Sequence, residues 1–526
     1  MRDQIRVFHL DSAEWERSIG LLADEYRIRE EALLPGIRTY YDTFDWRLFR
    51  KQLVFQKVKC QDKTELQVQS VDGQVVSETL LSVEPGFVWD LPEGALREKL
   101  APIIEMRRLL PLAEVSFHGV RFNFLNADEK TVARVLMTRR NASRPWESKL
   151  EEMLPVSLEV VPIKGYESEC SRIIDFVRSH LPVEEVSASE VVTALEMVGR
   201  TPCDYSSKLR VQLEPGMAAC EAAREIFRKL LDALLANEKG TRLDLDSEFL
   251  HDFRVAVRRT RAALAQLKGV ISPEMRNRFR SEFSWLGSLT GPSRDLDVYL
   301  LKMPDYRNSV PQSARDHLEP LTDFLVAKKA AERKRLIEAM DSERYRKLMT
   351  DWRAVLDVGS DSASDASAAG TPIKAAASKR IWKIYRRVLK MGAREGGSVE
   401  VEVLHRLRIE CKKLRYMMEF FRTLYEPKEL QGLIKILRRL QDNLGDFNDC
   451  EVQQVKLREF AGAMMDRGGF PPETFMALGC LVERLETRQA EELDRFAERF
   501  GDFSRPENQE RFRSLFSPER QQAKQY

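Results

Sequence analysis

The sequence has no closely spaced pair of cysteines. Its seven cysteines are scattered singly along 526 residues, and no CxxC motif occurs. Several lie in apolar, helix-forming surroundings, where a reduced cysteine behaves as a small hydrophobic side chain. This distribution argues against a disulfide framework and a structural zinc site, and it favours a reducing compartment. The seven positions are Cys60, Cys170, Cys203, Cys220, Cys411, Cys450 and Cys480.

Long apolar runs are also missing. No segment approaches the ~18 consecutive apolar residues that a membrane-spanning helix needs. The N-terminal segment, MRDQIRVFHLDSAEW, lacks the apolar stretch of a secretory signal. We therefore expect a cytoplasmic protein without a membrane partner.

Strong net charge is absent, but local charge is not. The formal net charge is +2, although 32% of the residues are charged. Between His251 and Arg280 the chain carries eight Lys or Arg against two Asp or Glu. A partner is therefore inferred from where the charges lie rather than from their sum.

The chain is long enough for more than one compact domain, since domains hold roughly 100–200 residues. Over residues 1–200, alternating apolar and polar residues predict half-buried strands. These strands are expected at residues 53–58, 64–69, 131–136 and 156–161, with helices at residues 12–27 and 167–180. The first domain is therefore predicted to be α+β with an antiparallel sheet.

From residue 208 to residue 515 the pattern is helical. Long amphipathic segments are separated by Pro and Gly, which we interpret as helix breaks at Pro215-Gly216, Pro273, Gly291-Pro292 and Pro427. Residues 357–372 lack large apolar side chains and are predicted to be a Ser/Ala/Gly linker. This linker divides an all-α domain into halves at residues 208–356 and 373–515.

The two halves repeat one another. The segment HDFRVAVRRTR, starting at His251, aligns with HRLRIECKKLR, starting at His405. At the same offset of 154 residues, LGSLTGPSRDLDV from Leu286 aligns with LQDNLGDFNDCEV from Leu440. One basic segment would carry little weight, whereas two in register indicate a duplicated element.

Helix geometry places the repeated cations in rows. At 3.6 residues per turn, positions i, i+3, i+7 and i+10 fall within an arc of roughly 80°. The first row is His251, Arg254, Arg258 and Arg261, and the second row is His405, Arg408, Lys412 and Arg415. The opposite faces carry Phe253, Val257 and Leu264 on one helix, and Leu407, Cys411, Leu414 and Met418 on the other. Arg259 and Lys413 lie about 80–100° from the centre of their rows and are flanking or structural.

A row of like charges costs stability through i,i+4 repulsion. Two such rows suggest a shared cationic groove for an anion, and phosphate suits the residue types. Guanidinium groups offer forked donors, lysine offers a point charge, and histidine can donate hydrogen bonds. We find no nucleophile–base pair and no metal-ligand spacing in these segments, so binding without a catalytic residue, metal or cofactor is predicted. The alternative is that each row is a solvated helix face, and the duplication in register argues against it.

These residues resemble the CHAD family, the conserved histidine α-helical domains. The resemblance rests on the two His-x-x-Arg patterns, on the block from Arg294 to Val298, and on Tyr416 after the second pattern. It implies two pseudo-symmetric helical halves around a basic pore that binds inorganic polyphosphate, often in cells or granules that store it. By position, the phosphate-facing set is His251, Arg254, Arg258, Arg261, His405, Arg408, Lys412 and Arg415. Arg386 and Arg387 are further flanking candidates or a solvated face.

The N-terminal region is similar to the CYTH, or triphosphate-tunnel, family. The similarity rests on RTYYDT from Arg38, on RLFRK from Arg47 and on a late acidic strand near Glu159. It implies a tunnel- or barrel-like sheet. Catalytic members begin with Glu-x-Glu-x-Lys, whose carboxylates hold a divalent metal. Here the first strand is taken as residues 4–8, which place Gln4, Arg6 and Phe8 at these positions, so we predict a catalytically degenerate domain.

Three functions therefore compete. The first is non-catalytic binding of inorganic polyphosphate, and the second is metal-dependent triphosphate hydrolysis by the N-terminal domain. The third is nucleic-acid binding, which is disfavoured because Tyr416 is the only aromatic residue beside the rows and no recognition motif occurs.

Overall fold

The computed structural model describes residues 5–61, 63–71, 75–80, 84–145, 151–186, 190–267, 272–357, 369–393 and 401–518. Gln4 and residues 358–368 of the predicted linker lie outside these ranges. The chain divides into two compact units, Met1–Ser206 and Ser207–Tyr526. We describe each unit by itself.

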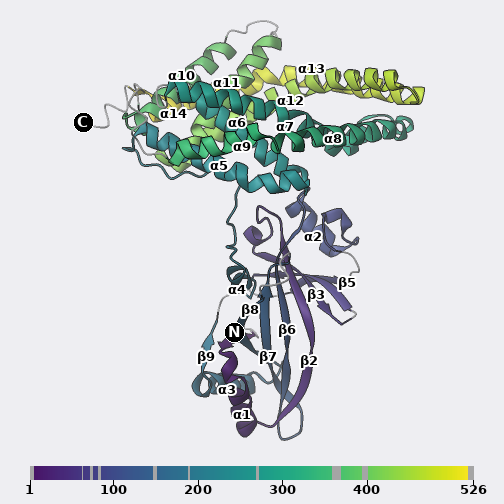
Figure 1. Ribbon diagram of the computed structural model, residues 1–526, viewed down its shortest axis with the longest axis vertical. Coiled ribbons are helices and arrows are strands. Elements are labelled where there is room, and N and C mark those ends of the chain that lie inside the picture. Colours follow the sequence, from purple (N-terminus) through teal and green to yellow (C-terminus); the bar gives the residue numbers. More distant parts are fainter. Residues whose placement is uncertain are drawn as a thin grey trace. The chain divides into compact units, whose positions relative to one another are not determined.

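The first unit is built on one antiparallel sheet (Figure 1). Its strands are β1 (Arg6–Leu10), β2 (Ile28–Asp42), β3 (Leu53–Cys60), β4 (Lys63–Ser70), β5 (Val75–Leu80), β6 (Leu110–Leu125), β7 (Thr131–Ser143), β8 (Glu151–Pro162) and β9 (Val183–Glu185). They lie in the order β5-β4-β3-β2-β6-β7-β8-β1-β9. Its helices are α1 (Trp15–Glu25), α2 (Ala95–Ile104), α3 (Glu167–His180) and α4 (Glu190–Met197). The predicted α+β class with an antiparallel sheet is confirmed.

Alternation along the strands gives the sheet two different faces. Phe8 and Leu158, which pair across β1 and β8, are both fully buried in a core shared with α1 and α3. On the other face, α4 packs Val191 and Leu195 against Tyr40 of β2. This second face, which we call the α4 face, also receives the charged side chains described below.

The second unit is all helical, as predicted (Figure 1). Its helices are α5 (Ala219–Leu243), α6 (Ser247–Gln266), α7 (Pro273–Ser309), α8 (Glu319–Met340), α9 (Glu343–Asp357), α10 (Ile373–Gly392), α11 (Val401–Phe420), α12 (Pro427–Arg467), α13 (Pro472–Phe503) and α14 (Pro506–Phe516). One large apolar core joins helices from before and after the predicted linker. The two halves are therefore packed together rather than separate.

The helix starts follow the offset found in the sequence. Helices α5, α6 and α7 begin 154 residues before α10, α11 and α12 respectively. The chain just before α5 pairs with the chain just before α10 through an antiparallel bridge between Ala218 and Pro372. These two bridged residues are themselves 154 positions apart.

The predicted helix break at Gly291-Pro292 is wrong, because α7 runs through it from Pro273 to Ser309. Proline in a helix interior removes a hydrogen bond to the carbonyl four residues earlier and costs about 3 kcal/mol. Pro292 is exposed, so water can reach that carbonyl, while Thr290, Ser293 and Leu296 on the other side are buried. Packing along the long helix outweighs the local defect.

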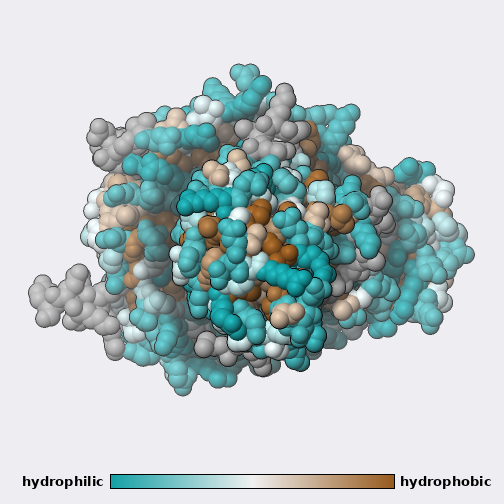
Figure 2. Space-filling model, turned by 90° about the horizontal axis from the view of Figure 1, so that it is seen from below, coloured by the Kyte–Doolittle hydropathy of each residue, from teal (hydrophilic) through white to brown (hydrophobic). Residues whose placement is uncertain are grey.

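Hydrophilic residues cover most of the face shown in Figure 2, with apolar residues appearing between them. Among the described residues, no helix combines the length and apolar character needed to cross a bilayer. The seven cysteines all lie in the described ranges, and none of them forms a disulfide.

Candidate functional site

The two predicted rows lie on α6 and α11, which pack against each other. Asp246 caps α6 by accepting hydrogen bonds from the backbone of Glu248 and Phe249 at 2.9 and 3.2 Å. The predicted apolar faces of both helices are fully buried in the main core. Each helix is therefore held with its basic face turned away from that core.

The first row changes from half-buried to exposed along α6. His251 and Arg254 are half-buried, whereas Arg258 and Arg261 are exposed. Burial lowers the pKa of Arg254, with further lowering by the neighbouring Arg258, Arg294 and Arg261. Within the described part of the chain, Arg258 and Arg261 form no ion pair. This end of the row therefore carries positive charge that no contacting carboxylate offsets.

Glycines on α7 make room for the first row. A Cβ atom at Gly287 would lie 2.8 Å from Nη1 of Arg261, and one at Gly291 would lie 3.1 Å from Nη1 of Arg254. Both glycines belong to the repeated block that starts at Leu286, so the sequence contained the signal, but residue type alone did not reveal the contact.

The second row is held by α12. Nδ1 of His405 lies 2.8 Å from Oδ1 of Asn448, and Arg408 donates to Asp449 at 3.0 Å. Asn448 and Asp449 are site residues that sequence reasoning did not assign, although they lie within the second repeated block. With Nδ1 engaged by an acceptor, a protonated His405 can donate from Nε2.

Lys412 lies where the two rows meet. Burial lowers the pKa of its ammonium group to about 8, and Arg408, Arg258 and Arg415 contribute to the lowering. Arg258 belongs to α6 and the other two arginines to α11, so cations from both rows act on one position. Lys412 forms no ion pair with the described residues. An anion bound here would relieve the mutual repulsion of these cations, and this relief favours its binding.

Carboxylates of α11 hold most of the flanking candidates, and one of them, Glu419, also lies 3.7 Å from Arg415 of the second row. Arg259 donates to Glu419 at 3.2 Å, and Lys413 donates to Glu410 at 2.7 Å. Arg387 donates to the same Glu410 at 3.3 Å. Arg386 is exposed on α10. Arg259, Lys413 and Arg387 are thus tied into the helix packing.

The α4 face of the first unit has a different, neutralised charge cluster. Arg38 donates to both oxygens of Glu190 at 2.7 and 2.6 Å, and Tyr40 donates to Glu190 at 3.0 Å. Arg140 lies 3.4 Å from the same carboxylate. Burial opposes the charge of Glu190, but Arg38 and Arg140 hold its pKa below the ordinary value. Glu190, at the start of α4, was missed because it lies 152 residues from Arg38.

The register of β1 corrects the first-strand assignment. Glu159 pairs with Val7, and Ser157 pairs with His9, so these residues share a face of the sheet. Phe8 lies in the core on the opposite face. The assignment of residues 4–8 was therefore wrong by one position, because the alternation of buried residues sets the strand's orientation. Neither Val7 nor His9 supplies a carboxylate, and burial followed by Glu190 raises the pKa of Glu159.

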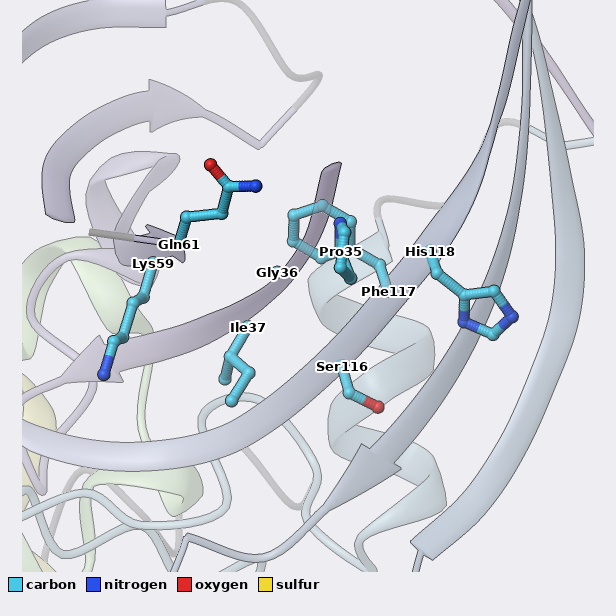
Figure 3. A pocket seen from close by; sticks show the side chains of 8 residues that line it. All are labelled: Pro35, Gly36, Ile37, Lys59, Gln61, Ser116, Phe117 and His118. Carbon is cyan, nitrogen blue, oxygen red and sulfur yellow. The ribbon is translucent and has the colours of Figure 1, made fainter. Parts of the chain in front are cut away.

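A cavity of about 430 Å³ lies elsewhere in the first unit, where β2 is bulged before Gly36 (Figure 3). Figure 3 shows Lys59 and Gln61 on one side of it and His118 turned away on the other. The cavity contains none of the predicted phosphate-facing residues. Its lining is Pro35, Gly36, Ile37, Lys59, Gln61, Ser116, Phe117 and His118.

The chain is similar to several solved structures. The CHAD domain from the plant Ricinus communis is 26% identical and covers 56% of this chain and 94% of its own, with a TM-score of 0.47. PptA from Streptomyces chartreusis is 16% identical and covers 54% of this chain and 99% of its own, with a TM-score of 0.40. A putative adenylyl cyclase from Hippeastrum, described as having a dominant triphosphatase activity, is 11% identical and covers 39% of this chain and 100% of its own, with a TM-score of 0.26.

No curated protein matches the chain. The family model of the CHAD domain matches residues 225–458. This range includes both α6 and α11 and therefore both cationic rows. The resemblance of the helical unit to the CHAD domain is confirmed over residues 225–458.

Proposed function

We propose that the helical unit binds inorganic polyphosphate through the two cationic rows, and that it does so without catalysing a reaction. The observation that carries the proposal is the convergence of both rows on Lys412. Burial, together with cations from α6 and α11, lowers the pKa of this lysine to about 8, and it forms no ion pair with the described residues. A polyanion with regularly spaced charges is the ligand that the CHAD resemblance implies for such a surface.

The residue types suit a phosphoanhydride chain. Guanidinium groups of Arg254, Arg258 and Arg261 offer paired donors, and each phosphoryl unit presents anionic oxygens to them. Lys412 offers a point charge between the rows. Because the cations are distributed along two helices, a chain that spans both should bind more tightly than a single phosphate ion.

We infer a non-catalytic role from the absence of a reactive partner near the rows. The cations of α6 and α11 have arginines, amides and aspartates beside them, and among the described residues there we identify no nucleophile paired with a base. In the first unit, Glu190 holds Arg38 and Arg140, and Glu159 of the late strand lies on their face of the sheet. A triphosphate hydrolase remains the alternative, tested by release of phosphate.

The test is titration of labelled long-chain polyphosphate into the wild type and an Arg254→Ala/Arg408→Ala variant, at low and moderate salt. Losing two charge-assisted contacts of about 1.5 kcal/mol each predicts roughly 100-fold weaker binding. A matched control is Arg280→Ala/Arg406→Ala, which removes one exposed arginine from each half outside the rows. Equal binding by both double variants would refute the assignment of the rows.

Nucleic acid needs a separate arm because it is also a polyanion. Unlabelled polyphosphate, single-stranded DNA and double-stranded DNA should each be added as competitors at equal phosphate concentration. We expect polyphosphate to compete best, since bases would gain no aromatic stacking along the rows. Stronger competition by either DNA would favour the nucleic-acid alternative.

A further inference from the structure

The second cationic row ends beside a carboxylate that lies within ion-pair distance of three arginines. Glu419, in the last turn of α11, lies 3.2 Å from Arg259 of α6, 3.7 Å from Arg415 of α11 and 3.4 Å from Arg438 of α12. Its side chain is only 16% exposed. One anion thus joins three helices at the position where the second row ends.

This arrangement is not repeated in the other half. The residue 154 positions before Glu419 is Ala265, and the residue 154 positions before Glu410 is Ala256. Helix α6 therefore lacks counterparts of Glu410 and Glu419. As a result Arg415 has a carboxylate within ion-pair distance, whereas its counterpart Arg261 has none among the described residues.

We propose that Glu419 is an internal competitor for bound phosphate, an inference that rests on the proposed polyphosphate function. Its carboxylate occupies an anion position between Arg259 and Arg415. A chain bound only to the first row and Lys412 leaves Glu419 in place. A longer chain that reaches the end of the second row displaces it and gains these arginines.

The energetics favour displacement only when the ligand is long. The side chains of Glu419, Arg259 and Arg415 are only 16–24% exposed, so each contact that Glu419 loses is costly. Several are lost together, and the repulsion between phosphate and the displaced carboxylate adds to this cost. Extra contacts from a long chain offset this cost. Glu419 therefore sets the chain length above which affinity rises.

The experiment compares wild type, Glu419→Gln and Glu410→Gln for binding of short and long polyphosphate. Glutamine keeps the size of the side chain and removes its charge. Glu410 is the matched control, because it lies on the same helix and holds Arg387 and Lys413 away from the rows. We expect Glu419→Gln to bind about fivefold more tightly and to reach tight binding with shorter chains. Glu410→Gln should bind as the wild type does.

The direction of the effect separates this proposal from a structural role. Loss of a purely structural ion pair would lower the melting temperature and leave affinity unchanged or weaker, which overturns the competitor role while the proposed function stands. A wild type that does not bind polyphosphate overturns both. Should Glu419→Gln fail to fold, Glu419→Asp replaces it, since withdrawing the charge by one methylene should still tighten binding. Weaker or equal binding by Glu419→Asp would again refute the competitor role.

Discussion

Lys412 makes the proposed binding depend on pH above neutrality. In the ligand-free protein the pKa of its ammonium group is about 8, whereas the ordinary value is 10.5. A bound phosphate chain stabilises the charged form and raises the pKa again. Between pH 8 and about 10 the free protein loses a proton that the complex retains, so affinity falls as pH rises through this window.

The magnitude follows from the size of the depression. Restoring the pKa from about 8 to 10.5 corresponds to about 3 kcal/mol, but Lys412 is partly exposed and solvent screening reduces this to about 1–2 kcal/mol. We therefore expect affinity to fall roughly tenfold between pH 7.5 and pH 9.5. At pH 8, where Lys412 is half-protonated, binding should take up about half a proton.

The assay is calorimetric titration with polyphosphate in two buffers of different ionisation enthalpy, repeated across this pH range. Lys412→Arg is the informative variant, because guanidinium stays charged throughout and should remove the pH dependence while retaining affinity. Lys412→Met should bind more weakly at pH 7 and also lose the dependence. If Lys412→Arg loses affinity between pH 7.5 and pH 9.5 as the wild type does, another group is responsible and the reasoning about Lys412 is wrong.

Three further predictions concern other parts of the chain. Glu190→Gln should destabilise the first unit by about 3 kcal/mol, because it leaves the buried Arg140 and the half-buried Arg38 with a neutral partner, and thermal denaturation of the full chain would show an earlier first transition. Gly287→Ala should weaken polyphosphate binding because its Cβ meets a guanidinium of the first row, whereas Gly445→Ala on α12, with open space around it, should not. Tripolyphosphate with Mg²⁺ or Mn²⁺ should release no more phosphate with wild type than with Glu159→Gln, and a clear difference would support the hydrolase alternative.

The helical unit was the more predictable part of the fold. The periodic apolar residues of α6 and α11 identified the faces that are buried. The helix period of about 3.6 residues fixes the direction in which each side chain points from the helix axis. The offset of 154 residues recurs in the helix starts. The helix break predicted at Gly291-Pro292 was wrong because proline destabilises a helix only locally, whereas packing along the whole length of α7 keeps the helix continuous.

The sheet was predictable in class but not in register. Strand alternation has a period of two, so a shift of one residue exchanges the two faces of β1. The aligned motif favoured residues 4–8, yet Phe8 and Leu10 belong to the core and turn Val7 and His9 to the other face. Only the buried partners of β1, which lie far along the chain, determine this choice.

The partners of the candidate site were the least predictable. Arg38 and Glu190 are 152 residues apart, and Arg259 and Glu419 are 160 residues apart. No local pattern marks either glutamate, since a single acidic residue on an amphipathic helix is common. Such pairs arise from the packing of distant elements and appear only once the helices and strands are placed.

The distribution of carboxylates is itself an argument about function. Helix α11 carries Glu410 and Glu419, which compensate the flanking Lys413 and Arg259 at ion-pair distance. Carboxylates thus pair with the flanking cations, whereas Lys412 lies beside other cations and has a pKa near 8.

The low pKa of Lys412 also predicts how the stability of the ligand-free protein depends on pH. Because Lys412 is harder to protonate in the folded chain than in the unfolded chain, the ligand-free protein should gain stability as pH rises from 8 towards 10.5. Lys412→Met should accordingly melt at a higher temperature than wild type at pH 7 without ligand and lose this advantage when long-chain polyphosphate is added. Equal melting temperatures of Lys412→Met and wild type without ligand would mean that solvent screens the charges of the rows. Repulsion between these cations would then not contribute to anion binding.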